Sequence, residues 1–151
     1  MPQYKTITHS HDIQITGTPA FNRVAKIVLD NLRRKQARAF RKLRRQHLIV
    51  QQADLPLDGP YATTAKIGPA QHIKVDMGRM LDQVEEELVA TDVLIGILID
   101  QIARIIIGNA HQKTQAELNA QVDELTIQWG FVNELAELRA LEYQRLSKKD
   151  G

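Results

Sequence analysis

Apolar side chains recur every three or four residues over most of the chain, which is the spacing of amphipathic helices. The first such segment begins at Thr18 and Pro19. Threonine caps the free N–H groups of a first helical turn, and proline at the first helical position gives up no hydrogen bond. Nothing breaks the helical pattern before the proline-containing segment that starts at residue 53. One long helix is therefore predicted over 18–52.

A second helix is predicted from Asp76, because apolar residues follow in alternating three- and four-residue steps. These positions are Met77, Leu81, Val84, Leu88, Ile95, Leu98, Ile102 and Ile105. Gly108 and Asn109 are a usual C-terminal stop, and the capping box "TQAE" from Thr114 starts a third helix. This spacing is typical of a coiled coil and predicts an antiparallel helical hairpin over 76–148.

Two segments lack helical spacing. Residues 1–17 alternate weakly between polar and apolar side chains, which favours an extended N-terminal arm. Residues 53–75 are predicted to be a Pro/Gly-rich crossing loop, because 53–70 hold three of the five prolines and two glycines. The expected fold is a single all-α domain: extended arm, long basic helix, crossing loop and helical hairpin.

The second half of the helix from Asp76 is apolar on the hairpin side and also on its far side, at Val93, Ile97 and Ile107. A helix that is apolar all round must be covered all round. The first helix can cover one side. Two alternatives remain for the rest: a three-helix core suffices, or neighbouring subunits complete the bundle in a homo- or hetero-oligomer. In the second case Val93, Ile97 and Ile107 are the expected oligomer interface.

The net charge of +2 conceals two opposed regions. Residues 19–50 contain ten Lys or Arg against the single acid Asp30, whereas the rest of the chain has ten bases and seventeen acids. Most of the positive charge lies in "RRKQARAFRKLRR", residues 33–45, and on a helical projection it forms one wide face opposite Phe40 and Leu43. The basic residues of this stretch are Arg33, Arg34, Lys35, Arg38, Arg41, Lys42, Arg44 and Arg45.

Three anions fit this basic face. The favoured one is nucleic acid, because six of the eight residues are arginines and the guanidinium group matches phosphate oxygens. The second is the acidic helix face of Asp82, Glu85 and Glu86, within the same fold or on another copy. The third is an anionic membrane, which we do not expect because the apolar stripe lacks bulky anchors. Since Phe40 is on the packing side, a duplex bound through its backbone is expected rather than stacked single-stranded bases.

Signatures of catalysis and cofactor binding are absent from the sequence. The chain has no cysteine and no Gly-rich phosphate loop, and the run Glu85 to Glu87 is an ordinary solvated helix face. The histidines are scattered, so no metal site is predicted; they are His9, His11, His47, His72 and His111. We therefore expect no enzyme, no cofactor and no small-molecule substrate.

Little in the sequence indicates location. Residues 1–20 lack the apolar region of a signal peptide. The most apolar run, 93–107, is too short to span a bilayer and contains Asp100 and Arg104 at the spacing of an ion pair. The compartment stays open, with a virion or the cytoplasm and nucleoid as the expected places.

An extended arm, the Arg-rich helix "RRKQARAFRKLRR", a Pro/Gly crossing and an apolar helical hairpin together resemble the major coat proteins of filamentous archaeal viruses, whose helical subunits wrap double-stranded DNA. The resemblance implies a structural role in a virion and assembly into a filament. The predicted function is thus a non-enzymatic structural protein that coats or packages duplex nucleic acid and self-assembles through its hairpin. The alternative is a helical adaptor or scaffold subunit whose basic face binds an acidic protein.

Overall fold

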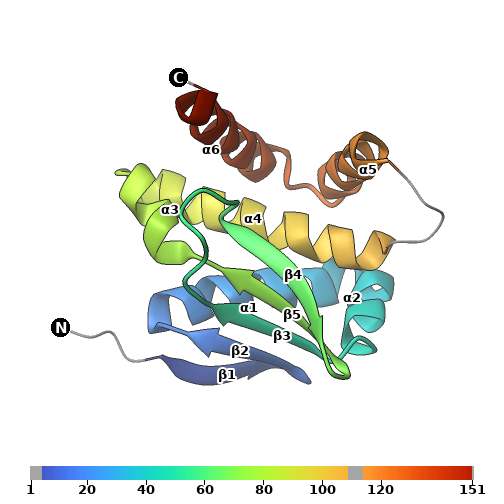
Figure 1. The fold of residues 1–151 in the computed structure, drawn as a ribbon. Helices are drawn as coiled ribbons and strands as arrows, with labels where there is room; N and C mark the ends of the chain where they lie inside the picture. The colour runs from blue at the N-terminus through green and yellow to red at the C-terminus, as the bar shows by residue number, and fades with distance from the viewer. Residues whose placement is uncertain (1–4, 109–113, 151) are drawn as a thin grey trace.

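A five-stranded mixed sheet forms the centre of one layer of the molecule (Figure 1). The computed structural model describes residues 5–108 and 114–150. The strands are β1 (Thr6–Ser10), β2 (Ile13–Gly17), β3 (Leu48–Gln52), β4 (Ala62–Ile67) and β5 (Ala70–Val75). Their order in the sheet is β1-β2-β3-β5-β4, with β2, β3 and β5 parallel and the two edge strands antiparallel.

The helices complete this layer and add a second one. Two of them, α1 (Pro19–Lys35) and α2 (Ala37–Arg44), connect the parallel strands β2 and β3, since neighbouring parallel strands need a crossover. The other helices follow the sheet: α3 (Met77–Gln83), α4 (Glu87–Ile107), α5 (Gln115–Gln128) and α6 (Val132–Asp150). In Figure 1, α4 has the sheet, α1 and α2 on one side. Helices α5 and α6 lie on its other side.

One face of the sheet belongs to the core. The buried residues alternate along the three parallel strands and are Ile13, Ile15, Leu48, Val50, Ile73 and Val75. The alternate positions of these strands are at least partly exposed and mostly polar, among them Gln14, Gln51 and Lys74. Alternation of this kind places α1 and α4 against one face and leaves the other to solvent.

The loop that crosses from β3 to β4 is held by Asp76, the N-cap of α3, and by Arg79 of α3. The Asp76 carboxylate accepts the N–H of Leu55 at 2.9 Å and that of Arg79 at 3.1 Å. The Arg79 guanidinium donates to the carbonyl oxygens of Pro56, Gly59 and Pro60 and lies 4.7 Å from the centre of the Tyr61 ring. The crossing loop is therefore tied to the first turn of a helix that follows it in the sequence.

A cluster of charged side chains joins α4 to α5 and α6. Asp100 of α4 is only 3% exposed and forms ion pairs with Arg104 at 2.9 Å and with Arg139 of α6 at 2.7 Å. Arg139 also pairs with Asp123 of α5 at 2.6 Å and with Glu142 at 3.1 Å. Burial opposes the charge on Arg139, but the carboxylates of Asp123 and Asp100 outweigh it and raise the pKa of the guanidinium. The ion pair that the spacing of Asp100 and Arg104 indicated is confirmed.

The all-α prediction is wrong, because the mixed sheet makes the fold α/β and neither a helical bundle nor a coiled coil. In the part of the predicted arm that the structure describes, residues 6–17 form the edge hairpin β1-β2. The helix predicted over 18–52 breaks at Gln36 and ends at Arg44, and 48–52 form β3. Short apolar runs such as "LIV" fit a strand and a buried helix equally well, and here pairing with β2 and β5 decides for the strand.

The predicted crossing loop and hairpin also differ from the structure. Residues 62–67 and 70–75 of the loop form the hairpin β4-β5. Non-helical residues separate α3 from α4 at 84–86 and α5 from α6 at 129–131, so each predicted hairpin helix is two helices. Leu88, predicted to lie on the hairpin seam, is 82% exposed. Three helix starts are confirmed: the side chains of Thr18, Asp76 and Thr114 cap α1, α3 and α5. Asn109 lies outside the described residues.

Gly96 permits the close approach of α6 to α4. A Cβ at this position would lie 2.5 Å from the Glu134 carbonyl oxygen, so Gly96→Ala is expected to push the helices apart and lower the free energy of unfolding by about 1–3 kcal/mol. Gly78→Ala in α3 is the matched control. A Cβ there would meet an Asp76 carboxylate oxygen at 3.9 Å, an ordinary van der Waals contact, and better helix propensity raises stability by about 0.5–1 kcal/mol. Urea unfolding measures both, and equal effects would contradict the close packing.

Glu142 provides a test that depends on pH. Burial raises the pKa of its carboxyl above the ordinary value, although Arg139 acts in the opposite direction. A raised folded-state pKa means that the ionised form is disfavoured in the fold, a cost that is present at neutral pH and disappears below the unfolded-state pKa. Glu142→Gln is therefore expected to raise the melting temperature at pH 7 but not at pH 4. A lower melting temperature at both pH values would show that hydrogen bonds to Arg139 outweigh burial.

Candidate nucleic-acid interface

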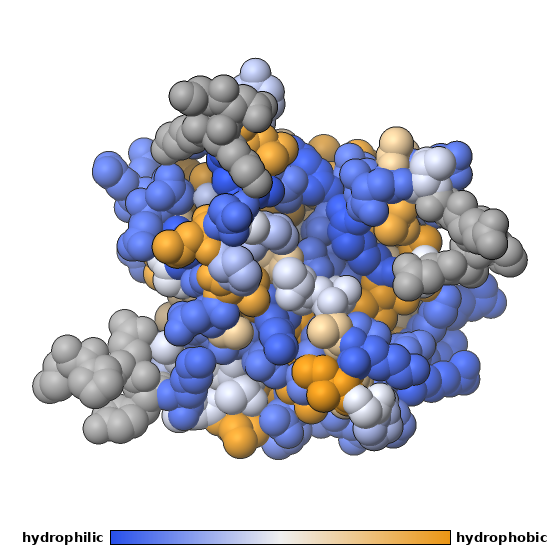
Figure 2. Space-filling view, viewed as in Figure 1, coloured by the Kyte–Doolittle hydropathy of each residue, from blue (hydrophilic) through white to orange (hydrophobic). Residues whose placement is uncertain are grey.

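The eight basic residues of 33–45 form one exposed surface, which we call the cationic end. Arg33, Arg34 and Lys35 are in the last turn of α1, and the others follow on α2 and at its C-cap. All eight side chains are exposed. Figure 1 shows α2 at the end of the molecule where α4 also ends, and in Figure 2 hydrophilic residues gather over that edge.

Packing on the inner side of α2 keeps the basic residues on its outer side. Phe40 and Leu43 are buried in the main core, so α2 is fixed to the rest of the fold. The ring of His11, in the turn between β1 and β2, meets Phe40 edge-on with ring centres 5.9 Å apart. His11 and His47 both have positive φ, a conformation that histidine adopts more readily than most residues. The buried Phe40 and Leu43 and the contact with His11 therefore fix α2, and with it the cationic end, to the rest of the fold.

Three of the eight basic side chains have partners within the fold. Arg44 forms an ion pair with Asp12 and lowers the pKa of that carboxyl, first through the side-chain hydrogen bond and then through its charge. Lys42 donates to the carbonyl oxygen of Ile106 at 2.5 Å, in the last turn of α4. Arg34 donates to the carbonyl oxygen of Asp30 at 3.3 Å. These contacts neutralise one of the eight charges with a carboxylate.

The other five basic side chains have no hydrogen bond or ion pair within residues 5–108 and 114–147. They are Arg33, Lys35, Arg38, Arg41 and Arg45. The acidic face that was one candidate partner lies elsewhere, since Asp82, Glu85 and Glu86 precede α4 while the cationic end adjoins its last turn. A helix of 21 residues is about 30 Å long, too far for an ion pair.

Lys66 lies beside the cationic end, which the sequence did not indicate. It is exposed in β4 opposite Gln71, whose N–H donates at 3.2 Å to the carbonyl oxygen of Gln46 in the turn after α2. A basic residue more than twenty positions from the Arg-rich stretch offers no local signal of this proximity. Strand pairing brings it there.

The predicted oligomer interface is not an available surface. Val93 and Ile97 are 1% and 2% exposed, because the chain's own elements surround α4. Ile107 is half-buried at the C-terminal end of α4. The sheet, which the all-α prediction lacked, covers one side of α4 in place of a neighbouring subunit.

Within the described residues, no three histidine or acidic side chains are grouped so that they can hold a metal ion. His111 lies outside the described residues. No helix among those described is long and apolar enough to cross a membrane.

No protein-family model, curated protein or solved structure matches the chain. The likeness to filamentous coat proteins therefore remains a prediction.

If the cationic end is free for a ligand, removing its charges leaves the fold intact. Changing Arg33, Arg38, Arg41 and Arg45 to Gln is expected to leave the melting temperature unchanged at moderate salt. The melting temperature of the variant should also rise less with added salt, because fewer like charges repel. Arg139→Gln, in the buried cluster, is the control and is expected to lower the melting temperature markedly. A large drop in the melting temperature of the fourfold variant would contradict a free cationic end.

Proposed function

We propose that this chain is a non-enzymatic protein that binds duplex nucleic acid, in the first place double-stranded DNA, through the cationic end. The supporting observation is the set of five exposed basic side chains without a partner among the described residues. Like charges on neighbouring turns repel one another, and phosphates remove that repulsion while their counterions are released.

The spacing on α2 favours a phosphate backbone. Arg38, Arg41 and Arg45 follow at three- and four-residue steps, which places them on one face of a helix and its cap. Guanidinium groups form paired hydrogen bonds with phosphate oxygens, and these contacts position a protein without reading sequence. Phe40, the aromatic residue of α2, is 3% exposed and so is not offered to unstacked bases. We infer binding with little sequence specificity.

The packaging role implied by the coat-protein resemblance needs many copies on one duplex and remains a further prediction. The adaptor alternative, an acidic protein on the same surface, uses the same arginines. It differs in one measurable respect, since it does not require affinity for random duplex DNA.

Binding to random duplex DNA tests the proposal. We expect the logarithm of the binding constant to fall with the logarithm of salt concentration with a slope of roughly −4 to −7, as for five to eight neutralised phosphates. Arg38→Gln, Arg41→Gln and Arg45→Gln together should make the slope less steep by about one unit for each arginine that no longer meets a phosphate. Fluorescence anisotropy over a salt series measures both values.

A charge-matched control separates a site from net charge. Arg23, Lys26 and Lys74 lie outside the cationic end, and changing all three to Gln removes the same formal charge. This variant should bind duplex DNA with an almost unchanged slope. No binding of the unaltered protein at low salt rejects the proposal and leaves the adaptor role. Equal losses in both variants would reject the cationic end as the specific surface.

A further inference from the structure

The opposite end of α4 carries the opposite charge. Asp82 of α3, Glu85 and Glu86 of the joint and Glu87 of α4 follow closely in the chain, and all four are exposed. Within the described part of the chain none of them forms an ion pair with lysine or arginine. The molecule therefore has free cations near the C-terminal end of α4 and free carboxylates near its N-terminal end.

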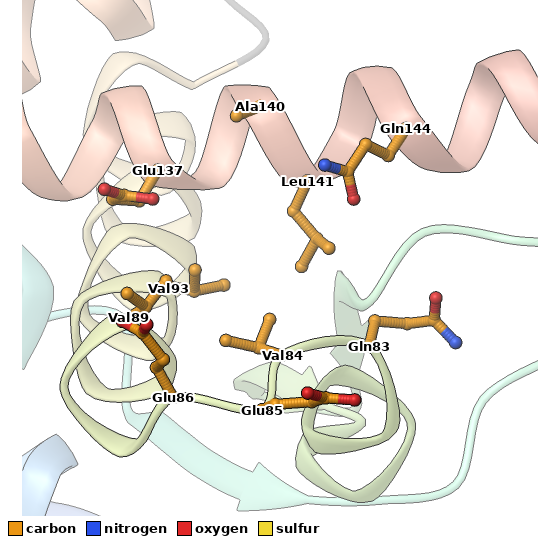
Figure 3. Close-up of a pocket in the computed structure, with 10 residues that line it drawn as sticks. All are labelled: Gln83, Val84, Glu85, Glu86, Val89, Val93, Glu137, Ala140, Leu141 and Gln144. Atoms are coloured by element: carbon orange, nitrogen blue, oxygen red, sulfur yellow. The ribbon is translucent and has the colours of Figure 1, made fainter.

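A cleft of about 370 Å³ is lined by two of these carboxylates, Glu85 and Glu86 (Figure 3). The joint between α3 and α4 forms one wall and α6 forms the other. Figure 3 shows Val84 and Leu141 pointing into the space from opposite sides, with Glu85 and Glu86 below and Glu137 on α6. Val89 and Val93 complete an apolar floor. We call this the acidic cleft: an apolar floor with carboxylates at its rim.

Such a cleft suits a long cationic side chain. The aliphatic stem of an arginine is buried favourably on an apolar floor while its guanidinium stays with polar partners at the rim. Carboxylates form short, paired hydrogen bonds with guanidinium groups. A neutral apolar segment would instead leave Glu85, Glu86 and Glu137 beside it with reduced hydration and no counter-charge.

We propose that the acidic cleft binds the cationic end of a second copy of this chain. Charge complementarity identifies the occupant, because Arg38, Arg41 and Arg45 are exposed on one face without a partner in the described residues. About 30 Å of helix separates the two surfaces within one copy, so they meet only between copies. The contact joins unlike surfaces, so each copy keeps one of each kind free and copies join head to tail. The inference goes beyond nucleic-acid binding and does not depend on it.

Two complementary variants test this arrangement. The cleft variant carries Glu85→Gln, Glu86→Gln and Glu137→Gln, and the α2 variant carries Arg38→Gln, Arg41→Gln and Arg45→Gln. In sedimentation velocity at low salt, the unaltered protein is expected to reach at least twice the mass of one 17.1 kDa chain as its concentration rises. Each variant alone stays monomeric. An equimolar mixture of the two forms a one-to-one dimer and nothing larger, because only one intact cleft and one intact α2 surface face each other.

A control variant and a parallel assay make the outcome unambiguous. Asp54→Asn, Glu117→Gln and Glu124→Gln remove the same charge from exposed positions outside the cleft and should leave association unchanged. Circular dichroism confirms that each variant is folded. An unaltered protein that stays monomeric at low salt overturns the proposal, and so does a mixture of the two variants that stays monomeric. Duplex binding by the cleft variant, measured separately by anisotropy, reports on the nucleic-acid proposal alone.

Discussion

Burial of α4 on every side is the constraint on which the rest of this fold depends. Ten of its residues are buried, so a layer on one side is not enough. The sheet, α1 and α2 cover one side, and α5 and α6 cover the other. Two residues of α4 do not fit a simple apolar helix, and α6 accommodates both. Its backbone approaches closely where Gly96 has no side chain, and its Arg139 supplies the counter-charge for buried Asp100.

The same helix explains how one small chain keeps opposite charges apart. Figure 1 shows α1 and α4 running in the same direction, so both C-termini lie near the cationic end. Partial negative charge at helix C-termini stabilises basic side chains there, as in the contact of Lys42 with the last turn of α4. Acidic residues around the start of α4, including Glu87, lie at the N-terminal end of the same dipole, where partial positive charge stabilises them. Helix direction therefore offsets part of the repulsion within each charged group.

Local signals in the sequence predicted local features correctly, and non-local pairing accounts for the errors. The caps at Thr18 and Thr114 need only neighbouring residues, and they are present. Phe40 and Leu43 were predicted opposite the basic face and both are buried, whereas 48–52, predicted as the end of the same helix, form β3. Burial follows from hydrophobicity in either geometry, whereas strand formation depended on partners in β2 and β5. Exposure of the eight basic residues was predictable for the same local reason; Asp12 and Lys66 beside them were not.

The two proposed uses of the cationic end are mutually exclusive at each copy, since both require Arg38, Arg41 and Arg45. Duplex DNA offers one phosphate for about every 1.7 Å of its length, and its counterions are released on binding. The acidic cleft offers a few carboxylates at fixed positions, and part of their attraction is lost in desolvating the pair. A duplex should therefore displace the neighbouring copy rather than share the surface with it. The two proposals together imply head-to-tail chains without nucleic acid, and a copy bound to duplex whose acidic cleft stays free for the next cationic end.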